Sequence, residues 1–372
     1  MQHRYEYPMN LRKRAALGLA ASALAAAAIA VLGGCMEPAT SAKPEGEANT
    51  LAIALSLPSS FTETQVATGL VKPTVMAFAP DGRIFVNEKA GTVRIIKNGA
   101  LLPTPFLSLT ANVNVNGENG LMGITLDPAF ATNHFVYVSY MSVTGPHLRI
   151  SRFTANGDVA SVASELALID MPTLTTAANN GGGIKFGKDG KLYIGTGDSH
   201  VDADAANLTS TRGKLLRINA DGSIPSDNPF FATATGLNRA IWAYGLRNAF
   251  SFAFQPGTGK LFLNDVGWNN FEEINEIVKG GNYGWPATEG PTTNPVYKTP
   301  FYAYNRANNG CAVISGAFYN PSSPSFPVEN VGVYFFGDYC NGISRLDPAT
   351  KAVVSFGSSS QAPTDLDRKS VV

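Results

Sequence analysis

Most of the candidate catalytic and ligand-binding residues of this sequence lie between residues 239 and 290. Arg247 and Asn248 follow an apolar and aromatic run that predicts a buried strand, so a guanidinium and an amide stand at its end. A buried guanidinium without a partner is costly, so this side chain needs one. From these residues alone, the favoured interpretation is a structural arginine paired with Asp265.

The loop from 265 to 273 has the composition of a metal site. Its turn at Gly267 leaves backbone carbonyls free to point at a ligand, and two adjacent acids, Glu272 and Glu273, follow. Calcium prefers this mixture of carboxylate and backbone oxygen atoms. The pattern therefore predicts a calcium site, and a solvated pair of acids is the alternative.

A repeated phrase predicts the elements that must position these residues. In its clearest copies, a turn rich in Asp and Gly joins strands in which apolar and polar residues alternate. The copies recur at intervals of roughly 45 to 75 residues, about the size of one four-stranded propeller blade. Five copies occupy residues 78–99, 126–142, 186–198, 254–267 and 332–351.

A sixth copy begins at Ala362, but the sequence ends at Val372, before a second strand. We therefore expect an all-β, six-bladed β-propeller whose last blade is incomplete, with residues 61–70 supplying one of its strands. An incomplete blade leaves strand edges exposed. This indicates a product truncated or frameshifted near its C-terminus, and a shorter natural fold is the alternative.

The N-terminal region is typical of an exported lipoprotein. A basic segment and an apolar run rich in Ala and Leu end at Cys35, which predicts a lipoprotein signal peptide over residues 1–35 with Cys35 lipidated. An ordinary transmembrane anchor is the alternative. Residues 36–60 are predicted to form a flexible tether, and residues 61–372 the propeller domain. We expect a membrane contact through the lipid only, on the periplasmic side or at the cell surface.

Composition excludes one class of partner and supports the fold class. Lys and Arg together number 28, as do Asp and Glu, so no basic field exists to attract nucleic acid. Charged residues make up only 15%, whereas glycines number 37 and prolines 23. This balance favours many tight turns over long surface helices.

Two cysteines remain once Cys35 is assigned to a lipid. Cys311 and Cys340 form an even pair in an exported chain, and each flanks a predicted strand. Neighbouring strands of one blade would bring them within bridging distance, so we expect a disulfide. Two buried free thiols are the alternative.

The order of several motifs resembles the glucose/sorbosone dehydrogenase family over nearly all of the chain from residue 61 onward. The motifs are GENGLMGITLDPAF, NNGGGIKFGKDGKLYIGTGD, GKLLRINADGSIPSDNPF, IWAYGLRNAFSFAF, NDVGWNNFEEIN and NYGWPATEG. Its members include soluble aldose sugar dehydrogenases that use pyrroloquinoline quinone on six-bladed propellers. The cysteine pair is similar to that of a disulfide-containing branch of the family.

The resemblance implies roles for the residues singled out above. It places Arg247 and Asn248 beside the quinone oxygens, and it makes Gly267 and Trp268 the backbone-carbonyl ligands of a calcium ion. The resemblance also associates the predicted acids, Glu272 and Glu273, with that calcium.

Further implied roles concern the sugar. Glu118 falls where a side chain contacts it, whereas Tyr283 and Trp285 either line its site or pack between blades. In the family reaction a base removes a proton from the anomeric hydroxyl and hydride passes to the quinone, which yields a lactone. Calcium and the arginine stabilise the charge that arrives on the quinone. An external electron acceptor must then reoxidise the cofactor.

Two departures from the family pattern weaken that expectation. Asn179 stands where the family has its catalytic histidine, and an amide cannot accept a proton near neutral pH. His200 is a poor substitute, because a lone loop histidine is usually solvated. The cofactor is a tricarboxylate, yet the positions expected to supply its late-blade cations hold Cys340 and Asn341, and residues 361–363 supply none.

Three functional hypotheses therefore remain. The first is an exported oxidoreductase that acts on aldose sugars with pyrroloquinoline quinone and calcium. The second is a catalytically weak or inactive calcium-binding propeller that binds carbohydrate or protein. The third is a lactonase-like propeller in which Glu118, Asp198 and Glu273 bind a hydrolytic metal.

Overall fold

The computed structural model describes residues 56–308, 310–358 and 363–367. The predicted signal peptide with Cys35 and most of the predicted tether lie outside the described residues. Ser56 is an exception, because its N–H donates to the Ser358 carbonyl at 3.0 Å, so the last residues of the predicted tether contact the domain. Among the described helices, none is long and apolar enough to cross a membrane.

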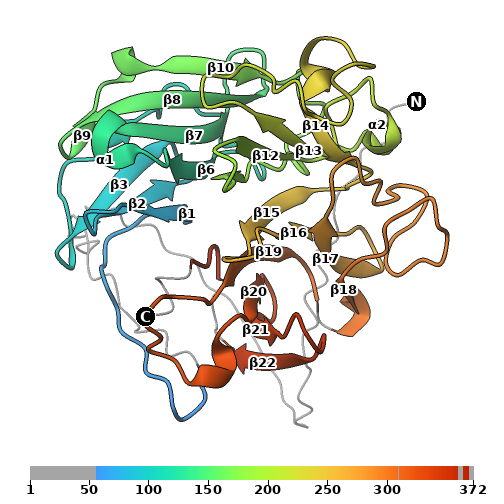
Figure 1. Ribbon diagram of the computed structural model, residues 1–372. Helices are drawn as coiled ribbons and strands as arrows, with labels where there is room; N and C mark the ends of the chain where they lie inside the picture. Colours follow the sequence, from blue (N-terminus) through green and yellow to red (C-terminus); the bar gives the residue numbers. More distant parts are fainter. Residues whose placement is uncertain (1–55, 309, 359–362, 368–372) are drawn as a thin grey trace, which may run out of the picture. The chain divides into compact units, whose positions relative to one another are not determined.

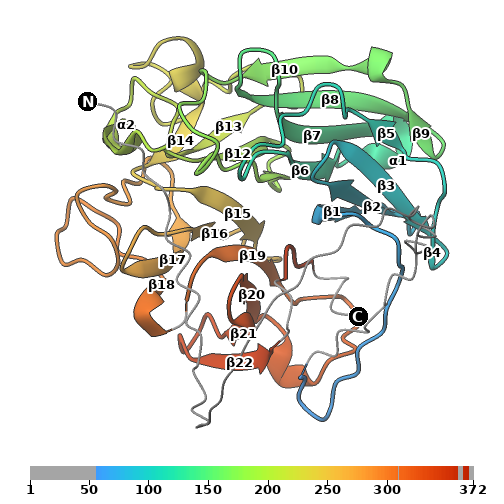
Figure 2. The same ribbon diagram turned by 180° about the vertical axis from the view of Figure 1, so that it is seen from behind.

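Five antiparallel sheets make up the described residues, and they follow one another through the colours of Figures 1 and 2. The first sheet contains β1 (Pro73–Phe78), β2 (Ile84–Glu88), β3 (Thr92–Lys97), β4 (Ala100–Leu101) and β5 (Leu107–Ser108). The second contains β6 (Leu121–Leu126), β7 (Phe135–Met141), β8 (Leu148–Asn156), β9 (Val159–Ala160) and β10 (Leu166–Asp170).

The other three sheets each have four strands in sequence order. The third contains β11 (Ile184–Phe186), β12 (Leu192–Thr196), β13 (Lys214–Ile218) and β14 (Ile241–Tyr244). The fourth contains β15 (Ala249–Phe254), β16 (Leu261–Asp265), β17 (Phe271–Ile277) and β18 (Tyr302–Asn305). The fifth contains β19 (Val313–Phe318), β20 (Tyr334–Asp338), β21 (Gly342–Leu346) and β22 (Val353–Gly357).

Turn chemistry explains why these strands form where they do. Gly82 has φ of 90° in the turn before β2, and the Asp81 carboxylate accepts the Arg83 N–H at 3.1 Å. The Asp189–Gly190 turn before β12 repeats this arrangement, since Gly190 has φ of 69° and Asp189 accepts the Lys191 N–H. Only glycine adopts such angles without steric cost, so the Asp and Gly pairs determine where each hairpin closes.

Consecutive sheets pack face to face, which is the arrangement of a β-propeller. The first strand of each sheet contacts the first strand of the next, in the order β1, β6, β11, β15 and β19. Separate apolar clusters fill the spaces between sheets one and two, two and three, three and four, and four and five. The predicted all-β propeller class is therefore confirmed.

The predicted number of blades is wrong for the described residues, which form five sheets rather than six. Residues 61–70, expected as a strand, contain none. The ring of Phe61 instead packs edge-on against Phe326 and Phe356, at 4.7 Å between centroids in each case. A strand needs a neighbour with which to form a hydrogen-bonded ladder, and this segment contacts β22 through side chains without pairing with a described strand.

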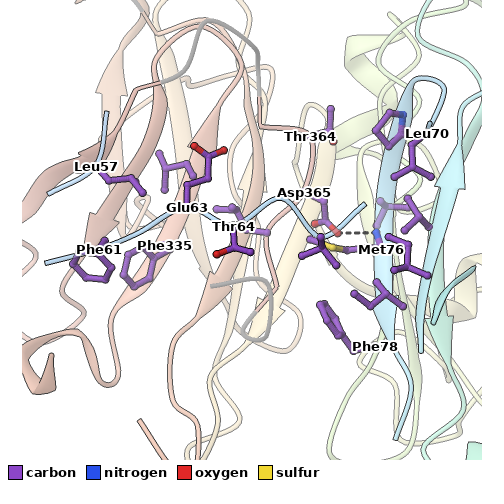
Figure 3. Close-up of a pocket in the computed structure, with 18 of the residues that line it drawn as sticks. Leu57, Phe61, Glu63, Thr64, Leu70, Met76, Phe78, Phe335, Thr364 and Asp365 are labelled. Carbon is purple, nitrogen blue, oxygen red and sulfur yellow. Dashed lines mark hydrogen bonds between the residues drawn. The ribbon is translucent and has the colours of Figure 1, made fainter. Parts of the chain in front are cut away.

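A cavity of about 480 Å³ lies between the first and fifth sheets (Figure 3). Its walls are mostly apolar and include Phe78 and Ile84 of the first sheet and Phe335 of the fifth. Beside the first sheet, the Met76 N–H donates to the Asp365 carboxylate at 2.9 Å. The segment that carries Asp365 therefore contacts β1.

Candidate functional site

Asp265 at the end of β16 organises the start of β15 through the backbone. Its carboxylate accepts the N–H of Arg247 at 3.0 Å and that of Asn248 at 2.6 Å. The Arg247 guanidinium does not pair with Asp265; its Nη1 donates to the carbonyls of Val266 at 3.0 Å and Gly267 at 2.5 Å. The predicted ion pair with Asp265 is therefore wrong, since that carboxylate is occupied by main-chain donors.

Two indole rings flank the Arg247 guanidinium. Its central carbon lies 5.3 Å from the ring centroid of Trp268 and 5.6 Å from that of Trp285. The two indoles stack with centroids 6.1 Å apart, and Trp268 is 40% exposed. The buried Nε of Arg247 has no hydrogen-bond partner. A buried cation beside two aromatic rings, with one free donor, suits a planar anionic group.

Tyr283 and Trp285 have different roles, although both lie in the same tight loop. The Tyr283 hydroxyl accepts the Val278 N–H and donates to the Glu276 carbonyl, so Tyr283 serves packing. Trp285 donates its Nε1–H to Asp198 at 2.9 Å and presents its ring to Arg247. Both residues line the small pocket beside Arg247, but of the two it is Trp285 that contacts the guanidinium.

Asn179 lies in the same region and is held from three sides. Its side-chain amide donates to Asp198 at 3.2 Å, its N–H donates to Glu118 at 2.9 Å, and its carbonyl accepts the Ser199 N–H. A Cβ added at Gly197 would lie 1.8 Å from the Asn179 carbonyl oxygen, so glycine is required there. The predicted residues Asn179 and Glu118 are therefore brought together.

His200 and Asn248 lie close to Asn179 and its partners but make different contacts. The His200 ring centroid is 6.2 Å from that of Trp268, and its N–H donates to Asp198 at 2.9 Å. Asn248 accepts the Gly181 N–H at 3.0 Å, which ties the start of β15 to the loop that carries Asn179. Asn248 thus positions the loop through its side chain.

The two predicted calcium acids point in opposite directions. Glu272 and Glu273 are consecutive on β17, and successive side chains of a strand lie on opposite faces. Glu272 accepts the Val313 N–H at 2.9 Å and pairs with the guanidinium of Arg306. Glu273 accepts the Gly290 N–H at 2.6 Å on the other face. One ion cannot be bound by both carboxylates in this arrangement.

Burial dominates the electrostatics of these acids. It raises the pKa of Glu272 to about 7, against the opposing effect of the Arg306 charge. Burial, followed by the charge of Asp265, raises the pKa of Glu273, and burial also raises the pKa of Asp265. The acids of β16 and β17 are therefore costly to ionise, and the charges of Arg247 and Arg306 offset part of that cost for Asp265 and Glu272.

Two side chains that sequence analysis missed hold the loop after Gly267. Glu289 accepts four consecutive backbone N–H groups with one oxygen, from Trp268 at 2.7 Å to Phe271 at 3.3 Å. Arg306 donates from Nη1 to the Gly267 carbonyl at 3.0 Å. Arg306 follows an aromatic run much as Arg247 does, and this similarity could have marked Arg306 as a site residue from the sequence. Nothing in the sequence marked Glu289.

The predicted disulfide between Cys311 and Cys340 is present, with the Cα atoms 5.8 Å apart. It joins the segment before β19 to the turn between β20 and β21. Asp338 accepts the N–H groups of both cysteines, at 3.2 Å for Cys311 and 2.8 Å for Cys340. The bridge therefore tethers the loop that begins at Arg306.

Comparison with known proteins places this site in a family. The sequence profile described as Glucose / Sorbosone dehydrogenase matches residues 70–322, which is more than half of the chain. The chain belongs to the glucose/sorbosone dehydrogenase family. The resemblance seen in the sequence motifs is thereby confirmed.

Individual family members agree with this assignment. An aldose sugar dehydrogenase of Escherichia coli K12 is 34% identical over 221 residues, which cover 58% of each protein. Quinoprotein glucose dehydrogenase B of Acinetobacter calcoaceticus is 30% identical over 294 residues, 69% of this chain and 60% of that protein. The match thus spans about three fifths of each of these two relatives.

A solved structure supports the fold. The soluble aldose sugar dehydrogenase of Escherichia coli, in its apo form, superimposes with a TM-score of 0.70 at 26% identity. The superposition covers 83% of this chain and 89% of that one.

The calcium ion that the family resemblance implies does not fit the residues as they lie. The Gly267 carbonyl accepts from two guanidinium groups, and the Glu272 carboxylate is paired with one of them. Among the described residues, the one group of three or more His, Cys, Asp or Glu ligand atoms within 4.8 Å of one another is Cys311, Asp338 and Cys340. Its sulfurs form the disulfide, and the acids of the lactonase hypothesis, Glu118, Asp198 and Glu273, do not form such a group.

The fit to an anionic quinone is partial. Arg247 with its free Nε suits one anionic or quinone oxygen, as argued above. The two described late-blade positions, 340 and 341, supply no cation, because Cys340 is in the disulfide and Asn341 is an exposed amide. Arg345, the nearest arginine in sequence, donates to Asn330 instead. Of the described residues expected to supply a cation to the cofactor, Arg247 is the one that offers a free donor.

Proposed function

We propose that the chain is an oxidoreductase of aldose sugars, related in mechanism to the quinone-dependent members of its family, with a low turnover rate. The observation that carries this proposal is the Arg247 guanidinium beside the stacked indoles of Trp268 and Trp285, with a buried, unpartnered Nε. Such a donor costs free energy unless a ligand satisfies it. The exposed indole of Trp268 offers an apolar face on which a sugar ring could stack.

The residues of the chain would divide the work as follows. Arg247 would stabilise negative charge arriving on an oxygen next to it, and the indoles would keep water from that charge. Asp198 holds both Trp285 and Asn179 in place through hydrogen bonds. Pyrroloquinoline quinone, when bound, would supply the hydride acceptor that converts the anomeric carbon to a lactone.

Asn179 is the reason to expect slow turnover. Its side-chain amide donates to Asp198, so it faces the site without a basic nitrogen. The loss of a positioned base typically lowers a rate by about 10²- to 10⁴-fold. His200 does not replace it, since its ring lies beside Trp268 and it is its backbone N–H, not its ring, that donates to Asp198.

The same observation favours a second candidate function. Without a base, the indole pair and Arg247 could bind a carbohydrate or an acidic protein segment and perform no reaction. Under either proposal, we expect the chain to act outside the cytoplasm as a lipoprotein anchored through Cys35. An external electron acceptor is needed only under the first.

One experiment separates the two functions. The chain and its Asn179→His variant would be mixed with pyrroloquinoline quinone, with and without calcium, and dye reduction followed with several aldoses. Quinone binding together with a 10²-fold or greater rate increase in the variant would support a weakened dehydrogenase. An Asn180→His variant serves as a neighbouring control. Absence of quinone binding in both the natural chain and Asn179→His would refute the first function, and sugar binding without the quinone would then support the second.

A further inference from the structure

Arg306 sits where the family resemblance places a metal ion. It lies in the short helix η3 (Arg306–Asn308) directly after β18, and its Nη1 bridges the Gly267 carbonyl and the Glu272 carboxylate. A backbone carbonyl and a carboxylate are the ligands expected of calcium in this loop. We propose that the guanidinium of Arg306 replaces the calcium ion in this chain, so that the loop from 265 to 273 folds without metal.

The acceptor capacity of the loop supports this assignment. A carbonyl oxygen has two lone pairs, and the Gly267 carbonyl accepts from both Arg247 and Arg306. Glu272 receives Arg306 on Oε1 and the N–H groups of Val313 and Gly267 on Oε2. A metal ion could bind these oxygens only after Arg306 had left them.

Charge leads to the same conclusion. The Glu272 side chain is 0% exposed, and Arg306 is the cation that contacts it. Removal of one partner of a buried ion pair leaves an uncompensated charge, which is strongly destabilising. The pocket therefore needs a positive charge, and the chain supplies one from its own sequence.

The backbone around Arg306 holds the guanidinium at this position. The Arg306 N–H donates to the Asn270 carbonyl at 2.9 Å, which joins η3 directly to the loop that it neutralises. A few residues further on, the disulfide of Cys311 tethers the same segment to Cys340. The side chain of Arg306 is 23% exposed, so it can be replaced without opening a large internal cavity.

Terbium luminescence tests the proposal without requiring sugar, quinone or turnover. Tb³⁺ occupies calcium sites, and the indoles of Trp268 and Trp285 lie close enough to Gly267 to sensitise its emission. The full chain would be titrated with Tb³⁺ beside Arg306→Gln, with calcium as competitor. We expect the natural chain to show no saturable, calcium-displaceable signal. Arg306→Gln should show one, at least about tenfold above the emission of the natural chain at the same Tb³⁺ concentration, because Glu272 then lacks a cation.

Two further variants show where the ion binds. Arg345→Gln removes another partly buried arginine, on β21 of the fifth sheet, and should leave Tb³⁺ binding as in the natural chain. Arg306→Gln combined with Glu272→Gln should lose the gained binding. Saturable Tb³⁺ binding by the natural chain, or no gain in a folded Arg306→Gln protein, would overturn the proposal.

A melting measurement covers the case in which Arg306→Gln does not fold. The natural chain should then melt at the same temperature in calcium and in EDTA. A higher melting temperature in calcium would refute the proposal that Arg306 replaces the ion. Because none of these readouts uses the quinone, failure here is distinct from failure of the proposed sugar oxidation.

Discussion

Replacement of Glu289 should disrupt the loop that carries the candidate site. One oxygen of this carboxylate accepts four consecutive N–H groups from Trp268 to Phe271, and the other accepts the side-chain amide of Asn270 at 2.9 Å. A hydrogen bond to a charged group contributes about 1.5 to 3 kcal/mol. The four bonds share one oxygen and cannot add fully, so we expect Glu289→Ala to lower the free energy of unfolding by about 3 kcal/mol.

Glu289→Gln provides an intermediate case. It keeps an acceptor oxygen but loses the charge, so the expected cost is about 1 kcal/mol. Glu276→Ala is the matched control, because its carboxylate makes a single ion pair with Lys260 at the surface, which is expected to contribute less than about 1 kcal/mol. Urea unfolding followed by tryptophan fluorescence measures all three variants.

The fluorescence of the folded proteins adds a second readout. Trp268 takes its position from the loop that Glu289 holds, so Glu289→Ala should alter the folded-state emission, whereas Glu276→Ala should not. The reasoning would be refuted if Glu289→Ala cost no more than Glu276→Ala and left the emission unchanged.

Two further outcomes can be measured in the same unfolding assay. Replacing both Cys311 and Cys340 by Ser, or reducing the natural chain, should lower the free energy of unfolding by about 2 to 4 kcal/mol. The reason is that the bridge closes a loop across 29 positions. An unchanged urea midpoint of unfolding would contradict this. Burial raises the pKa of Asp365 to about 6, so the native carboxyl keeps its proton to higher pH than the unfolded one. Its contribution to the free energy of unfolding should therefore be complete below about pH 4 and be lost as the pH rises through 6. Asp365→Asn should remove this pH dependence of the free energy of unfolding.

Local features of the sequence predicted much of the fold. The Asp and Gly pairs specify hairpin turns through the backbone angles they allow, and the alternation of apolar residues specifies which strand faces are buried. Arg247 was recognised because a charged residue at the end of an apolar strand is unusual. The cysteine pair was recognised because its members flank predicted strands. Each of these inferences depends on residues close together in the chain.

One error was avoidable from the sequence, and one was not. Glu272 and Glu273 were assigned to the same ion, although adjacent residues of a strand face opposite sides. The pairing of Arg247 with Asp265 was reasonable but wrong, because the carboxylate is satisfied by backbone N–H groups whose direction is known only once β15 and β16 are aligned.

The sequence by itself determined the all-β class, the repeated hairpins, the disulfide partners and the family. The tertiary structure alone decided that five sheets form among the described residues, that Glu289 holds a loop about 20 positions away, and that Arg306 neutralises Glu272 across 34 positions. The physical reason is that turn angles and side-chain alternation act over a few residues. Which cation reaches a buried carboxylate depends instead on where distant strands and loops come together as the sheets pack.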